Sequence, residues 1–314
     1  MRQRPFRQID VFTSVPYLGN PVAVVLDGEG LSDAEMQRFA RWTNLSETTF
    51  VTPPTPQAAA QGADYQVRIF TPGGELPFAG HPTLGTCHAW LEAGGQPQSP
   101  GRIVQQCKVG LIQIARQEDR LAFAAPKLTR RAPEPGLLAD ILKALGLQTT
   151  QVRSAQLLYN GPEWLGILVD STDTVLQVEP DHMALKTLGH KVGLVAVEYA
   201  QPAPLLIARK NREARAFAPS SPSGQAQSAE ANMCTVEVRA FASPLGVNED
   251  PVTGSLNASL AQWLISEGHA PPCYLATQGC CVGRDGRIHI EQDASGQVWV
   301  GGDAVTCISG IVAL

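Results

Sequence analysis

The 314-residue sequence has no apolar run that reaches the ~18 residues of a membrane-spanning helix. Residues 1–6 (MRQRPF) lead into an alternating strand pattern and not into the hydrophobic core of a signal peptide. Charged residues make up only 17% of the chain, the net charge is −5, and Lys and Arg form no dense stripe. These absences argue against membrane and nucleic-acid partners. They predict a soluble, cytoplasmic protein whose partner is a small molecule.

Patterns that would indicate a disulfide framework, a metal site or a bound nucleotide are also missing. The seven cysteines are odd in number and scattered, and none forms a Cys-x-x-Cys pair. The chain has no His-x-x-x-His pair, no glycine-rich nucleotide fingerprint in a strand-to-helix context and no Gly-x-Ser-x-Gly elbow around a nucleophile. We therefore expect reduced thiols, no metal site and no nucleotide site.

What the sequence does contain is a short pattern that occurs twice. Residues 80–85 (GHPTLG) and 249–255 (EDPVTGS) share a polar residue, then Pro, two spacers and Gly, and each opens an apolar, helix-like run. The similarity extends upstream, where residues 67–70 (VRIF) and 238–241 (VRAF) precede the two copies. Internal repetition indicates a duplicated architecture, and the chain length suits two domains.

Residue patterns predict many short strands and one long helix in each half. A capping box at Ser32 and Glu35 predicts a helix over residues 33–43. The other expected helices cover 136–145, 181–188 and 255–266, with one more inside 79–95, and a Ser-, Ala- and Gln-rich insertion covers 209–232. Strands are expected at 8–12, 22–26, 48–52, 65–71, 102–124, 164–169, 193–198, 235–241, 274–278, 287–291, 297–301 and 305–314. This composition predicts an α+β fold of two pseudo-symmetric domains, each an antiparallel sheet rolled around a central helix.

A Pro- and Arg-rich stretch at residues 126–135 predicts the boundary between the domains. We expect an N-terminal domain over 1–126, completed by a C-terminal strand at 303–314, and a C-terminal domain over 127–302.

The repeated pattern also indicates where chemistry would take place. Asp250 before Pro251 has two interpretations, either a helix N-cap or a functional carboxylate. His81 is a poorer cap, and the glycines around it allow close approach of a ligand. If the halves face each other, both helix N-termini point at one cleft, where their free amides would favour a carboxylate.

Glu47 is the third candidate, because it lies between apolar neighbours at the start of an expected strand. Desolvation there would raise its carboxyl pKa and suit it to general acid/base catalysis near neutral pH. The alternative interpretation is an exposed carboxylate at the end of a helix. The residues alone leave both interpretations open.

Several of these segments together resemble the PhzF-like phenazine-biosynthesis family. They are residues 10–12 (DVF), 19–24 (GNPVAV), 44–48 (NLSET), 70–72 (FTP), 75–82 (ELPFAGHP), 159–162 (YNGP) and 249–255 (EDPVTGS). The resemblance implies the diaminopimelate-epimerase fold, a homodimer and a cleft between the two domains. It also implies a cofactor-independent isomerase that acts on trans-2,3-dihydro-3-hydroxyanthranilate.

By the same resemblance, Glu47 would move a proton between ring carbons while His81 and Asp250 orient the substrate and assist proton transfer. Gly80, Gly254 and Ser255 would donate to the substrate carboxylate, and Asn20 is a further substrate-binding candidate. Epimerase relatives carry two catalytic cysteines at the starts of the central helices, where this chain has His81 and Asp250. Two alternatives remain open: an amino-acid or imino-acid epimerase with non-thiol bases, and a non-catalytic metabolite-binding protein.

Overall fold

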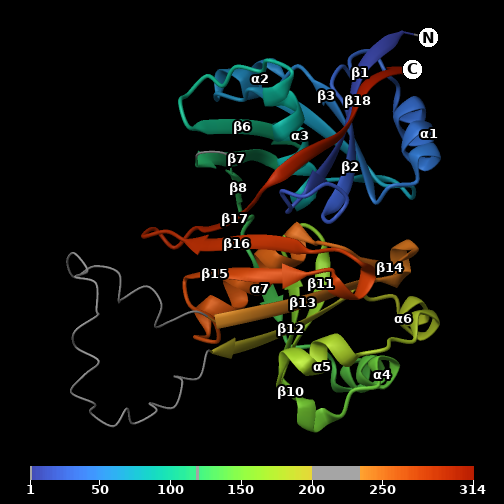
Figure 1. Ribbon diagram of the computed structural model, residues 1–314, viewed down its shortest axis with the longest axis vertical. Coiled ribbons are helices and arrows are strands. Elements are labelled where there is room, and N and C mark those ends of the chain that lie inside the picture. The colour runs from blue at the N-terminus through green and yellow to red at the C-terminus, as the bar shows by residue number, and fades with distance from the viewer. Residues whose placement is uncertain (1, 118–119, 200–233) are drawn as a thin grey trace, which may run out of the picture.

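The computed structural model describes residues 2–117, 120–199 and 234–314 and divides into two halves, one above the other in Figure 1. The expected insertion at 209–232 lies outside these residues. No helix in the described part of the chain has both the length and the apolar character needed to cross a bilayer.

Each half contains strands with one long central helix. The first half consists of β1 (Gln3–Val11), β2 (Asn20–Val25), α1 (Asp33–Thr43), β3 (Glu47–Thr52), α2 (Pro56–Ala60), β4 (Tyr65–Phe70), β5 (Glu75–Leu76), α3 (Gly80–Glu92), β6 (Arg102–Cys107), β7 (Gly110–Gln117) and β8 (Arg120–Ala124). The second half consists of β9 (Thr129–Arg131), α4 (Pro135–Leu145), η1 (Thr149–Gln151), β10 (Val152–Tyr159), β11 (Glu163–Val169), α5 (Thr172–Gln177), α6 (His182–Leu188), β12 (Val192–Tyr199), β13 (Cys234–Ala242), η4 (Ser243–Leu245), β14 (Val247–Asp250), α7 (Gly254–Ser266), β15 (Cys273–Gln278), η5 (Cys280–Val282), β16 (Gly286–Gln292) and β17 (Val298–Gly302). The last strand, β18 (Ala304–Ala313), returns to the first half and pairs with β1.

The central helices are α3 and α7, and strands surround both of them. α3 contacts β1, β2, β3, β6, β8 and β18, whereas α7 contacts β10, β11, β16 and β17. Residues 80–87 of α3 and 254–261 of α7 are all buried. A helix that is largely apolar on every side is stable only inside a core. The α+β class predicted from the sequence, with a sheet around one helix in each half, is therefore confirmed.

Strand pairing follows the same plan in both halves. β2 and β3 pair in parallel, as do β4 and β6, and in the second half β11 with β12 and β13 with β15. A helix connects the two strands in every one of these pairs, because a parallel neighbour needs a crossover. The remaining pairs are antiparallel, so each sheet is mixed, a detail that the sequence patterns did not reveal.

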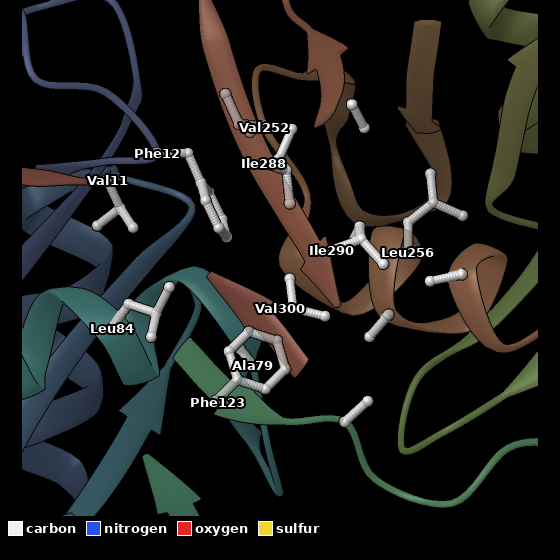
Figure 2. Packing of buried hydrophobic residues seen from close by; sticks show 14 of the residues in the cluster. Val11, Phe12, Ala79, Leu84, Phe123, Val252, Leu256, Ile288, Ile290 and Val300 are labelled. Carbon is white, nitrogen blue, oxygen red and sulfur yellow. The ribbon is translucent and has the colours of Figure 1, made fainter. Parts of the chain in front are cut away.

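The two halves share one hydrophobic core and one strand pairing. β8 of the first half pairs antiparallel with β17 of the second. At this junction Phe123 lies opposite Val300, and both are fully buried. Figure 2 shows Phe12 and Phe123 converging with Val252 and Val300. Helices α1, α4, α5 and α6 cover the outer faces of the sheets (Figure 1). The shared core fixes the position of one central helix against the other.

Candidate active site

The two central helices begin against each other. A Cβ atom on Gly80 would lie 2.8 Å from the carbonyl carbon of Gly254, and one on Gly254 would lie 3.0 Å from the amide nitrogen of His81. Real Cβ atoms do not approach backbone so closely, so only glycine fits at either position. The repeat predicted from the sequence therefore brings its two copies together at the junction between the halves.

Neither helix start is capped by a side chain of the described residues. The N-cap residues are Ala79 for α3 and Thr253 for α7, and within the described ranges no side chain accepts a hydrogen bond from the first turn of either helix. The capping interpretation of Asp250 is therefore wrong, because this residue ends β14, three positions before the N-cap. Two sets of free amides and two helix dipoles point at the same place, which favours an anion there.

A cavity of about 420 Å³ opens beside these helix starts, a size typical of small-molecule sites. Its wall includes six of the seven residues predicted from the sequence, all except Asn20: Glu47, Gly80, His81, Asp250, Gly254 and Ser255. Apolar side chains complete the wall, among them Leu45, Phe78, Pro162, Trp164 and Leu245. The duplication thus places carboxylates and imidazole in a largely apolar pocket.

Asp250 is held by hydrogen bonds from both halves. Its Oδ1 accepts from Nδ2 of Asn20 at 2.9 Å, and its Oδ2 accepts from Oγ1 of Thr253 at 2.6 Å. Asn20 is 1% exposed and also donates to the carbonyl of Val252 at 2.8 Å. The structure thus places Asn20 behind Asp250, where it fixes the carboxylate across the domain junction. Direct contact of Asn20 with a substrate stays a prediction.

Glu47 and His81 approach each other from different elements. Glu47 begins β3, His81 lies in the first turn of α3, and Oε2 of Glu47 is 3.3 Å from Nε2 of His81. The angles do not meet those of a hydrogen bond, so both atoms are buried without a partner in the described structure. The His81 ring hydrogen-bonds to the Pro21 carbonyl, which is an acceptor only, and because Nε2 has no partner we assign the ring proton to Nδ1. Nε2 is then an unprotonated acceptor that faces Glu47.

Burial shifts the pKa values of Glu47, Asp250 and His81 in the direction that favours the neutral form of each. It raises the pKa of Glu47 to about 8, with the nearby charge of Asp250 acting in the same direction. It raises the pKa of Asp250 to about 6, although hydrogen bonds from Thr253 and Asn20 oppose the shift. Burial lowers the pKa of His81 to about 3, so the imidazole is neutral. Of the two interpretations of Glu47, the structure supports the desolvated carboxyl.

Thr253, Trp164 and Lys191 also line the cavity, and none of them was predicted as a site residue. Thr253 belongs to the repeat but carried no signal beyond its position, and its hydroxyl orients Asp250. Trp164 donates from Nε1 to Oγ of Ser255 at 3.3 Å, and its ring lies beneath the ammonium of Lys191, 4.6 Å from the ring centre. Neither Trp164 nor Lys191 lies in a motif. Only the three-dimensional fold brings them to the cavity.

Thiols and metal ligands do not gather here. No cysteine is among the described residues that line the cavity, and Cys87 is buried within α3 with its pKa raised to about 12. All seven cysteines are described and free. In the described ranges no group of three or more His, Cys, Asp or Glu residues is placed to hold a metal ion.

A larger hollow of about 790 Å³ lies over β15, β16 and β17, and its chemistry is different. Of its two carboxylates, Glu291 is exposed and Asp293 is half-buried, and hydrogen bonds from Ser295 and Trp299 lower the pKa of Asp293 to about 2. A carboxylate that is exposed or has a low pKa is a poor proton carrier at neutral pH. The cavity between the helix starts is therefore the candidate active site.

Two pseudo-symmetric halves around a cleft of this kind define the diaminopimelate-epimerase-like fold, here in an isomerase. The chain belongs to the family described as "Phenazine biosynthesis-like protein", which matches residues 9–224 and 222–310. The fold and the family expected from the sequence are thereby confirmed.

Individual relatives cover nearly the whole chain. Antisense-enhancing sequence 1 of Schizosaccharomyces pombe is 34% identical, over 99% of each chain. Trans-2,3-dihydro-3-hydroxyanthranilate isomerase of Pseudomonas aeruginosa is 31% identical, over 92% of this chain and 90% of the relative. The crystal structure of a PhzF-family phenazine biosynthesis protein from Bacillus anthracis superimposes with a TM-score of 0.76 at 21% identity, covering 100% of both chains.

Proposed function

We propose that the protein is a cofactor-independent isomerase that moves a proton between carbons of a small, cyclic carboxylate. The observation that carries this proposal is the Glu47 carboxyl, buried beside His81 and Asp250 with its pKa raised to about 8. A carboxylate of raised pKa is a stronger base, and with a pKa of about 8 its acid form predominates at neutral pH. One side chain is thus suited to take a proton from one carbon and return it to another.

The cavity supplies the other requirements of this reaction. The free amides at the starts of α3 and α7 hold the substrate carboxylate, with Gly80, Gly254 and Ser255 as donors. Neutral His81 presents an unprotonated Nε2 to Glu47, and its low pKa leaves the proton on the Glu47 carboxyl. Asp250 orients a polar group of the substrate. The apolar wall excludes water and protects a reactive enamine or ketone product.

The most specific substrate we propose is trans-2,3-dihydro-3-hydroxyanthranilate, for which relatives from Pseudomonas are named. Incubation of the purified protein with this compound in deuterated water tests the proposal. We expect an isomerised product with deuterium on a ring carbon, detected by NMR and mass spectrometry. An unchanged substrate would refute this substrate. If the protein instead inverts the α-carbon of a chiral amino acid in deuterated water and places deuterium there, the result would support the epimerase alternative.

We further propose that the protein forms a homodimer. β18 pairs with β1 along one edge, and no described strand pairs with its other edge. Ile308 and Ile311 on this strand are 50% and 63% exposed, which offers apolar area to a second copy. Light scattering during size-exclusion chromatography should give twice the chain mass of 33.5 kDa, and a monomeric mass would refute the dimer.

A further inference from the structure

Lys191 is a cation that the proposed reaction does not use, although it lines the same cavity as Glu47, His81 and Asp250. It directly precedes β12, and its carbonyl accepts a hydrogen bond from the amide of Leu165 at 2.8 Å. That bond continues the parallel ladder between β11 and β12, in which Leu165 lies opposite Val192. The backbone of Lys191 is therefore fixed by the sheet.

The side chain is also held in a defined position. Its ammonium lies 4.6 Å from the centre of the Trp164 ring, within the range of a cation–π interaction. Trp164 is only 3% exposed and is anchored in turn, because its Nε1 donates to Oγ of Ser255 at the start of α7. This arrangement differs from a surface lysine, whose ammonium moves freely in water.

The ammonium has no counter-ion in contact with it. Throughout residues 2–117, 120–199 and 234–314, no carboxylate lies within 4.0 Å of Lys191 and no side chain accepts a hydrogen bond from it. Glu47, Asp250 and Glu163 act on it only from a greater distance. Burial lowers its pKa to about 8, so most of the population is still charged at pH 7. A cation removed from water in this way is costly unless an anion neutralises it.

We propose that Lys191, resting on Trp164, forms a second anion subsite, so that the cavity binds a small ring compound with two acidic groups more tightly than a ring with one carboxylate, dihydro-hydroxyanthranilate included. This inference rests on the proposed function, in which the helix starts of α3 and α7 bind the first carboxylate. The first subsite consists of backbone amides, whereas the second is the side chain of Lys191, directly before β12. One cavity thus offers two separate positive centres. A substrate with a single carboxylate leaves one of them without a partner.

Binding of two aromatic probes tests the subsite without knowledge of the physiological substrate. Isothermal titration calorimetry at pH 7 compares benzoate with benzene-1,3-dicarboxylate, which keep the same ring and differ by one carboxylate. Wild type should bind the dicarboxylate about tenfold more tightly or better, as one charge-assisted contact provides. Lys191→Met should reduce this ratio to below about twofold and leave benzoate affinity unchanged. Lys191→Arg, which keeps the charge, should retain most of the preference.

The dependence on pH separates this role from a structural one. In wild type the preference should fade between pH 7 and 9.5, because the ammonium loses its proton around pH 8 while both probes keep their charge. In Lys191→Arg it should persist, since the guanidinium stays protonated. Ionisation of Glu47 in this range repels the dicarboxylate more strongly than benzoate, so both pH series are measured in a Glu47→Gln background, where this charge cannot form. Thermal unfolding checks that each variant is folded.

Equal binding of the two probes by wild type would overturn the subsite, as would an undiminished preference in Lys191→Met. Lys191→Met could also keep the wild-type preference for the dicarboxylate and change only the pH–rate profile. That result would overturn the subsite too, because Lys191 would then act only on the pKa of Glu47 and Asp250. The two proposals fail separately. A dicarboxylate preference without any proton exchange into substrate would support the subsite and refute the proposed function.

Discussion

Glu47 shows what the sequence predicts about the site and what only the structure shows. The sequence indicated an apolar neighbourhood for this carboxyl, but it could not decide whether the side chain faces water. That decision depends on the opposite half of the molecule, because Asp250 and Lys191 reach the same cavity from β14 and from the start of β12. Long-range packing of this kind leaves no local pattern. Lys191 and Trp164 escaped prediction for the same reason.

The raised pKa of Glu47 has a consequence for stability. Its folded pKa of about 8 exceeds the ordinary value of 4.5, so the native state keeps a proton that the unfolded chain releases. This contribution is complete below pH 4.5 and is lost as pH rises through 8. We therefore expect Glu47→Gln, which cannot ionise, to gain stability relative to wild type between pH 5 and 8, by about 1.4 kcal/mol per unit of pKa difference.

Urea unfolding at several pH values measures this difference. His81 is present in both proteins, so its own titration cancels. Asp250→Asn provides a control background, because the Asp250 charge helps to raise the pKa of Glu47 and its removal should shrink the effect. A difference between wild type and Glu47→Gln that stays constant with pH would show that Glu47 titrates normally.

Among the elements, the starts of α3 and α7 determine the geometry of the site. The sequence predicted both helices from the repeat, and the capping box at Ser32 correctly predicted the start of α1 at Asp33. The sequence left Asp250 open between an N-cap and a functional carboxylate, because Asp followed by Pro is a common helix start. Here Pro251 and Val252 lie between Asp250 and the N-cap Thr253, so the carboxylate lines the cavity and does not cap the helix.

The contact between these helices can be tested with one methyl group. Gly80→Ala places a Cβ 2.8 Å from the backbone of Gly254 and 2.9 Å from the Phe123 ring. We expect it to lower the free energy of unfolding by about 2 kcal/mol or more and to weaken binding of benzoate, because the helix starts must separate. Gly136→Ala in α4 is the matched control.

A Cβ at Gly136 meets nothing within 4 Å, and its φ is not positive. That variant should unfold with unchanged or slightly higher free energy, by less than about 1 kcal/mol. Chemical denaturation and calorimetry give both quantities. Equal behaviour of the two alanine variants would show that the helix starts do not require a close approach.

On the scale of the whole molecule, duplication explains both the fold and the site. In the first half Arg68 pairs with Glu75 and lies over Phe70. In the second, Arg239 pairs with Glu249 and lies over Phe241. The sequence revealed these equivalent arginines, but not the glutamates that they bind. β18 pairs with β1 and β9 pairs with β10, and this supports our proposal of domains over 1–126 with 303–314, and over 127–302.

The duplicated fold forms the cavity, and the residues that differ between the two copies of the repeat carry out the chemistry. One copy of the repeat carries His81 and the other carries Asp250, while Glu47 approaches from β3. From the sequence we could predict the class of fold that forms this cleft, but not which strands pair. Which side chains meet inside it followed from the structure.

The most direct test of this account is proton exchange into substrate by wild type and Glu47→Gln in deuterated water. Trans-2,3-dihydro-3-hydroxyanthranilate is the first substrate, and deuterium on the product ring is followed by mass spectrometry. We expect wild type to incorporate deuterium during isomerisation and Glu47→Gln to lose at least about 100-fold of the rate, as removal of a general acid/base does. Deuterium incorporation by Glu47→Gln at the wild-type rate would contradict the central claim.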